Sequence, residues 1–353
     1  MQKRFILTSI DKGNDNMKIK VVFALLGSII ICMLGIAIGS VLIPFNDIIA
    51  VIGSKVLGTA KDAGIDKVTL SIIWDMRIPR VLMAFAVGAA LSVSGAIMQS
   101  TLKNPLASSY TLGVSSGAAF GAGIVITAGL TLPILGFLTL PLAGFIFGML
   151  TVLGAVAFAA SMDRSMDTNT IILSGMVFSL FVNAMLTLMS SLKREDAQKL
   201  IMWQMGSFSQ KSWVHVMIFL PIAFILIFFT LFYVRELDLL TFGEEHAKAA
   251  GVDANKVKWI LLGLSSALTG CAVSFGGVIG FVDLVAPHVV RKIYGSSHRI
   301  VVPISAIFGG CFMVVADLIA RTIISPSELP VGAVTALVGA PFFGYVYFSG
   351  RKR

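Results

Sequence analysis

The chain has 353 residues, of which 57% are hydrophobic and 13% are charged, and its mean hydropathy is +0.93. These values exclude a soluble domain of ordinary make-up. The formal net charge of +9 does not indicate a nucleic-acid partner, because the basic residues form no run with interleaved aromatics and lie mostly at the ends of apolar stretches. The composition therefore predicts an all-α polytopic membrane protein.

Ten apolar segments follow one another along the chain, most of them near the roughly 20 residues that a bilayer requires. They lie at 21–43, 81–101, 112–130, 133–160, 170–191, 214–234, 258–276, 278–293, 302–324 and 331–349. The eighth is short, so we expect it to be tilted, re-entrant or buried by its neighbours. One transmembrane domain at 21–349 is predicted, with tails at 1–20 and 350–353, and the Lys/Arg distribution favours cytoplasmic tails.

Three arginines lie on the side that should be poor in positive charge. Arg77 and Arg80, in RIPR, are predicted at the outer end of the second span, and Arg321, in ADLIAR, near the outer end of the ninth. Guanidinium groups bind carboxylates through two parallel hydrogen bonds, which suggests docking of an acidic partner. Snorkelling to lipid headgroups, or an internal pair of Arg321 with Asp317, explains them as well.

A polar break at Lys103-Asn104-Pro105-Leu106 follows the second span. Non-helical backbone at membrane depth must be shielded by protein or line a wet cavity. The break is consistent with a transport pathway and equally with a simple loop.

A charged insert at 235–258 separates two apolar stretches and must be in contact with water. Within it the sequence predicts a short helix with Glu244 and Glu245 in its first turn, ended by Gly251. A small, alanine-faced helix on a polar loop suits the groove of another protein. A plain connecting loop is the alternative.

Chemistry-bearing residues give little support to an enzyme. The four histidines are scattered, and the three cysteines lie far apart in apolar runs, so no metal spacing is present. Asp283 and Asp317 are acids embedded in apolar sequence, which would suit an ion-coupled secondary transporter. The sequence has no phosphate-binding loop, so any ATP-driven activity needs a second polypeptide.

Several motifs resemble one known family. They are RIPRVLMAFAVGAALSVSGAIMQSTLKNPLASSYTLGVSSGAAFG, GEEHAKAAGV, GFVDLVAPHVVR, HRIVVPISA, ADLIAR and ELPVGAVTALVGAPFFGYVY. Together they closely resemble the FecCD family of ABC-importer permeases, from the second span almost to the end of the chain. The family motif usually has glycine where this chain has Asp283, which raises the question of whether that carboxylate pairs with an arginine or contacts cargo.

The resemblance implies a type II ABC importer permease fold like that of the cobalamin importer, in a bacterial cytoplasmic membrane. The implied partners are a second permease subunit, identical or related, two ATPases that bind ATP and Mg, and an extracytoplasmic binding protein. Iron-siderophore complexes, haem and cobalamin are the family's cargoes, and a ferric siderophore is the first expectation. The chain itself would bind no cofactor and catalyse no reaction.

The resemblance also implies roles for individual residues. Arg77, Arg80 and Arg321 match positions that pair with glutamates on the binding protein. The ATPase coupling helix matches Gly243, Glu244, Glu245, Ala247, Lys248, Ala250 and Gly251. Asn104 and Leu106 match one cytoplasmic gate, and Thr168 and Asn169 resemble the other.

Overall fold

The computed structural model describes residues 2–58, 64–133, 135–163 and 166–350, and within these ranges the regular structure is entirely helical. Residues 351–353 of the predicted C-terminal tail lie outside them. In chain order the elements are α1 (Gln2–Ala37), α2 (Phe45–Leu57), α3 (Lys67–Ser71), η2 (Ile72–Arg77), α4 (Ile78–Thr101), η3 (Ser109–Leu112), α5 (Val114–Ala128), α6 (Gly136–Met162), α7 (Thr168–Leu192), α8 (Arg194–Gln204), α9 (Trp213–Leu231), α10 (Val234–Phe242), α11 (Glu244–Ala249), α12 (Ala254–Gly276), α13 (Val282–Tyr294), α14 (His298–Thr322) and α15 (Val331–Gly350).

Each predicted span contains a helix. In the described ranges, seven helical stretches are long and apolar enough to cross a membrane, and two shorter apolar helices lie at Val114–Ala128 and Val331–Tyr345. α13, the predicted short eighth span, has 13 residues. The prediction of about ten spans in an all-α membrane protein is confirmed, with short members among them.

Two predicted boundaries are wrong. The first span ends at Ala37 rather than at 43, because the chain leaves the helix there and re-enters one after Pro44. The second span begins at Lys67 rather than at 81, since α3, η2 and α4 form one continuous helical stretch of 35 residues. Arg77 and Arg80 therefore lie inside this helix and not at its end.

The second span is the central helix of the bundle. In its most apolar window 89% of the residues are buried, compared with 22% in α7 and in α9. Small residues allow this burial: a Cβ atom on Gly88 would lie 2.2 Å from the carbonyl oxygen of Gly309 in α14. One on Gly95 would lie 1.8 Å from the carbonyl oxygen of Asp283 in α13. Backbone-to-backbone contact of this kind is typical of packed membrane helices.

Polar groups inside the bundle bond to one another. The Ser94 hydroxyl in α4 lies 2.8 Å from those of Ser109 and Ser265 and 2.6 Å from that of Thr269. This four-hydroxyl cluster joins α4, η3 and α12 in a region closed to solvent. Such bonding is required where water is excluded.

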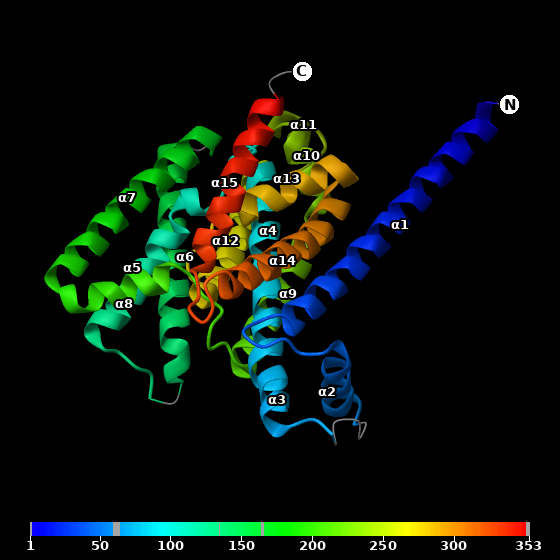
Figure 1. The fold of residues 1–353 in the computed structure, drawn as a ribbon. Helices are drawn as coiled ribbons and strands as arrows, with labels where there is room; N and C mark the ends of the chain where they lie inside the picture. The colour runs from blue at the N-terminus through cyan, green and yellow to red at the C-terminus, as the bar shows by residue number, and fades with distance from the viewer. Residues whose placement is uncertain (1, 59–63, 134, 164–165, 351–353) are drawn as a thin grey trace.

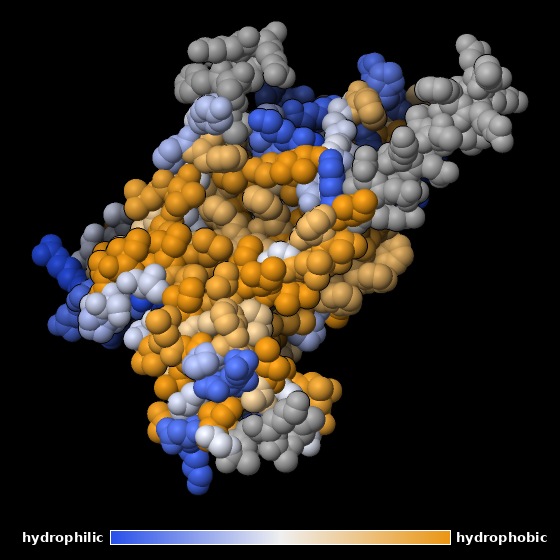
Figure 2. Space-filling view, turned by 45° about the vertical axis from the view of Figure 1, so that its right-hand side comes forward, coloured by the Kyte–Doolittle hydropathy of each residue, from blue (hydrophilic) through white to orange (hydrophobic). Residues whose placement is uncertain are grey.

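The face drawn in Figure 2 has a broad apolar band with polar groups toward its two ends. α2 and α3 lie at one end of the molecule, whereas α10, α11 and both chain termini lie at the other (Figure 1). A membrane-spanning protein with two polar ends, formed by different helices, follows from this arrangement.

Candidate docking, coupling and gating sites

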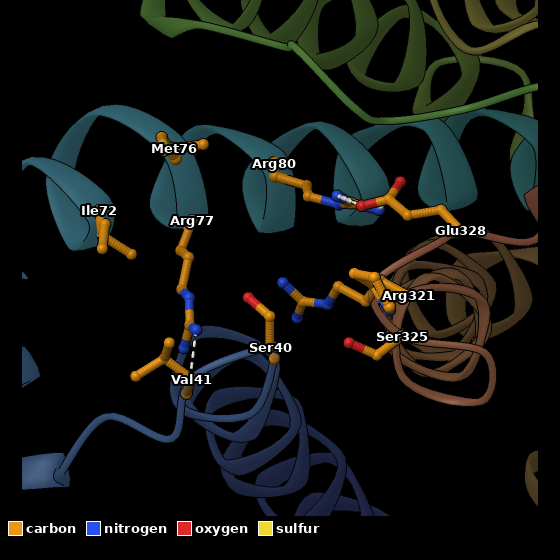
Figure 3. Close-up of a pocket in the computed structure, with 11 residues that line it drawn as sticks. Ser40, Val41, Ile72, Met76, Arg77, Arg80, Arg321, Ser325 and Glu328 are labelled. Carbon is orange, nitrogen blue, oxygen red and sulfur yellow. Dashed lines mark hydrogen bonds and ion pairs between the residues drawn. The ribbon is translucent and has the colours of Figure 1, made fainter.

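The three predicted docking arginines line one pocket. Its volume is about 290 Å³, and it lies between the start of the second span, the chain before α2 and the loop that follows α14. In Figure 3, Arg77 and Arg80 extend from one helix toward the segments that carry Ser40, Arg321 and Glu328. The structure thus brings together residues that are almost 250 positions apart in sequence, from Arg77 to Arg321.

Arg77 binds the backbone where the chain leaves α1. Its side chain is buried, and Nη1 donates to the carbonyl oxygens of Ile36 at 2.7 Å and Ala37 at 2.8 Å, while Nη2 donates to that of Val41. The last carbonyls of a helix have no partner within it, so a cation there is favourable. Arg77 therefore stabilises the end of α1, a role that the sequence analysis did not predict.

Arg80 is bound by two acids. Its Nη2 lies 2.8 Å from Oδ1 of Asp317, whose side chain is 1% exposed, and its Nη1 lies 2.6 Å from Oε1 of Glu328, whose side chain is 34% exposed. Nε also donates to the Asp317 carboxylate. Asp317 is thus a fixed partner, whereas Glu328 lies at the solvent side of the pocket.

Arg321 is also largely enclosed. Its Nη2 donates to the carbonyl oxygen of Gly35, and its Nε lies 3.8 Å from Oδ2 of Asp317. The internal pair that sequence analysis kept as an alternative to docking is therefore present, and Arg80 shares the same acid. Glu328 was not singled out, although it lies in the quoted motif ELPVGAV.

The predicted coupling helix is present as α11. Gly243, at φ 126°, separates it from α10, and Gly251, at φ 82°, follows its last turn. These values favour glycine because side chains clash there. Ala247 is fully buried, so it anchors the helix to the rest of the protein, although the alanines were expected to face a partner. Glu245 and Lys248 are exposed.

Glu244 points back into the protein. Its Oε1 accepts a hydrogen bond at 2.6 Å from Nζ of Lys258, a fully buried lysine at the start of α12, and lies 3.6 Å from Nζ of Lys103. The sequence analysis placed Lys258 at the edge of the charged insert and gave it no role.

The first predicted gate is a compact turn. The Asn104 side chain accepts a hydrogen bond from the backbone N–H of Leu106 at 2.9 Å, and Leu106 is exposed. Asparagine commonly organises turns in this way.

The second predicted gate is the start of α7. The Asp167 carboxylate caps the helix by accepting from the backbone N–H of Asn169 at 2.9 Å, and Thr168 is the first helical residue. Asn169 lines a cavity of about 440 Å³ beside the end of α6. No direct bond between the two predicted gates is found in the described part of the chain, although residues next to both pack in one hydrophobic cluster.

Asp283 lies at the first turn of α13 and is 2% exposed. Its carboxylate accepts a hydrogen bond from the Ser108 hydroxyl. Among the described residues no cation lies within ion-pair distance of it, but Arg291 donates to the side chain of Gln99, which in turn contacts the Asp283 backbone. The connection from Arg291 therefore reaches the backbone of Asp283 and not its carboxylate, which is enclosed.

Comparisons with known proteins agree with this geometry. Residues 25–349 match the FecCD transport family. The chain is 39% identical over 314 residues to the ABC transporter permease protein YvrB of Bacillus subtilis (strain 168), covering 89% of each chain. It is 37% identical over 286 residues to the cobalamin import system permease protein BtuC of Halobacterium salinarum, covering 80% of this chain and 75% of that one.

A solved structure agrees as well. The fold matches a metal-chelate type ABC transporter in an inward-facing conformation with a TM-score of 0.80 and 30% identity, covering 94% of this chain and 99% of that one. The protein is a multi-pass membrane permease, the transport subunit of a type II ABC importer in which a separate subunit hydrolyses ATP. It belongs to the FecCD transport family.

Proposed function

We propose that this subunit accepts an iron chelate, a ferric siderophore, from an extracytoplasmic binding protein and passes it to the bacterial cytoplasm by alternating access. The observation that carries the proposal is that the segments lining the arginine pocket lie toward the end that carries α2 and α3, whereas α11 lies at the opposite end of an apolar bundle (Figure 1). One end then receives the loaded binding protein and the other contacts the ATPases. A second permease, identical or related, would complete the pathway.

Arg80 is the docking residue that the geometry favours. Glu328, on the solvent side, accepts from Nη1 and Nη2 at one edge of its guanidinium, an edge that a carboxylate can therefore bind. A glutamate of the binding protein would meet the same group. Arg77 and Arg321 would contribute mainly positive potential, because their donors are directed to backbone carbonyls.

α11 is the proposed contact with the ATPase. Its buried Ala247 and the inward-facing Glu244 fix one side, which leaves Glu245 and Lys248 exposed to a partner. Movement of the ATPase pair would then be transmitted to the predicted gates at Asn104 and Thr168.

Several relatives favour an iron or tetrapyrrole cargo. One is named a permease for Fe(3+)-citrate, one for siderophore transport, one for hemin and one for cobalamin, whereas another is named for molybdate, which is neither an iron chelate nor a tetrapyrrole. Iron chelates and tetrapyrroles are bulky, so one permease architecture suits both. Ferric siderophore is our choice, and haem and cobalamin are the alternatives that the test must separate.

The complete transporter, with its ATPase and binding protein, should be reconstituted in lipid vesicles and supplied with ferric siderophore, haem or cobalamin. We expect ATP-dependent uptake of the ferric siderophore, and none by vesicles that contain this chain alone. Uptake of haem or cobalamin in its place would refute the cargo. Transport by the chain alone, or transport abolished by an ionophore and independent of ATP, would refute the importer and favour an ion-coupled carrier.

A further inference from the structure

Lys258 is a buried cation that joins three segments. It lies in the second turn of α12 with a fully buried side chain. Its Nζ lies 2.6 Å from Glu244 Oε1 in α11 and donates to the carbonyl oxygen of Met166, before α7, at 2.7 Å. A buried ammonium is costly unless its donors are satisfied by well-placed acceptors. These contacts therefore fix α11 and the Met166 backbone relative to each other.

Glu244 extends the connection to a third segment. The same Oε1 atom lies 3.6 Å from Nζ of Lys103, in the turn that precedes Asn104. One carboxylate oxygen is thus placed between two ammonium groups from different segments. A displacement of α11 moves this oxygen and so changes both interactions at once.

The backbone at both connected positions is strained. Lys103 has φ 48° and Met166 has φ 52°, and neither is a glycine. Non-glycine residues adopt this region at an energetic cost, and such positions persist only where their surroundings hold them. Lys103 immediately precedes the predicted gate residue Asn104, and Met166 lies two residues before the predicted gate residue Thr168.

Packing makes the two gate segments one unit. Leu102 and Ala107 on either side of the first gate, and Met166 and Ile171 on either side of the second, share a hydrophobic cluster with Leu262 of α12. Ala247 of α11 belongs to a different cluster, the main core. The Lys258 ion pair therefore bridges two apolar clusters.

We propose that Lys258, through Glu244, is a positioning residue that ties α11 to the segments around Asn104 and Thr168, so that one movement of α11 repositions both gates. The proposal rests on the proposed function, in which α11 receives the motion of the ATPase. Lys258 contacts neither cargo nor nucleotide in this scheme, and its effect is on coupling between hydrolysis and transport.

The test uses Lys258→Met in the complete reconstituted transporter, with ferric siderophore as the transported probe. Uptake per ATP hydrolysed is measured, together with amide hydrogen exchange in 100–107 and 166–172, with and without ATP plus vanadate. We expect uptake per ATP to fall about fivefold or more while ATPase co-purification and hydrolysis persist. The nucleotide-dependent change in exchange should be lost in both segments and retained in α11.

Lys256→Met is the matched control, because Lys256 is an exposed lysine two residues away on the same helix. It should leave uptake per ATP and exchange unchanged. If Lys258→Met does not fold, the same measurements are made on Glu244→Gln. Glu244 is the less buried partner of the ion pair, and glutamine keeps a hydrogen-bond acceptor while removing the charge.

Wild-type coupling in Lys258→Met, with both segments still responding to nucleotide, overturns the proposal. The same applies to Glu244→Gln if that variant is used. Failure of the wild-type chain to co-purify with an ATPase would instead reject the proposed function, so the two failures are distinguishable.

Discussion

Arg77, Asp283 and Lys258 are charged side chains inside the helical bundle, and each is held by a partner from another segment. Arg77 binds carbonyls at the end of α1, Asp283 accepts from Ser108, and Lys258 binds Glu244 and Met166. Removing one partner of such a group leaves a buried charge without compensation, which costs more than the pair contributes to stability. Their first role is therefore to fix helix positions.

Gly95 is the residue at which helix packing can be tested most directly. A Cβ atom there would lie 1.8 Å from the backbone oxygen of Asp283, and backbone cannot move aside cheaply. Gly95→Ala should lower the free energy of unfolding by about 1–3 kcal/mol or more, measured by denaturant titration in detergent micelles. Gly263→Ala is the control, because nothing lies within 4 Å of its added Cβ atom. Equal stability of the two variants would contradict the close approach of α4 and α13.

The arginines of the pocket could be predicted from the sequence, but most of the groups that they bind could not. Arg77, Arg80 and Arg321 were indicated by their position on the side that should be poor in positive charge, and the structure does place them around one pocket. Their bonds to Glu328 and to the carbonyl of Gly35 could not be predicted, since they join positions more than 240 residues apart. Such contacts depend on tertiary packing, which one sequence does not encode as a local pattern.

Long helices and short helices differ in how well the sequence predicts them. Spans such as α7 and α14 follow from apolar length alone, because a bilayer imposes it. α2, α8 and α10 were not predicted, since they are short and their helical character depends on the neighbours that they pack against. α11 was predicted because acids occupy its first turn and Gly251 follows it.

The docking role proposed for the arginine pocket can be tested by replacing Glu328. If Glu328 competes with the binding protein for Arg80, Glu328→Gln should tighten docking by about tenfold at low salt. The gain in affinity should be smaller at high salt, because salt screens the charges. Docking is measured by surface plasmon resonance on the detergent-solubilised permease complex. Glu195→Gln, which removes an exposed acid in α8, is the control. Weaker or unchanged docking in Glu328→Gln would reject the competition.

At the scale of the whole molecule, the polar ends define an orientation. The proposed function requires α11 to face the cytoplasm and the arginine pocket to face outward. In a variant whose Cys32, Cys271 and Cys311 are replaced by alanine, Ala249→Cys should react with a membrane-impermeant thiol reagent only in permeabilised cells. Ser327→Cys, exposed beside the pocket, should react in intact spheroplasts. The reverse pattern would contradict the predicted cytoplasmic termini.

The burial of the second span has a consequence for biosynthesis. Arg80 and Ser94 of this helix bond to Asp317, Ser265 and Thr269, which the ribosome makes more than 170 residues later. Until those segments are inserted, the helix must enter the bilayer with polar groups that still lack their final partners. Truncation of the chain before α12 should therefore leave a nascent second span that quality-control proteases recognise. The last third of the polypeptide decides whether the first third is retained in the membrane.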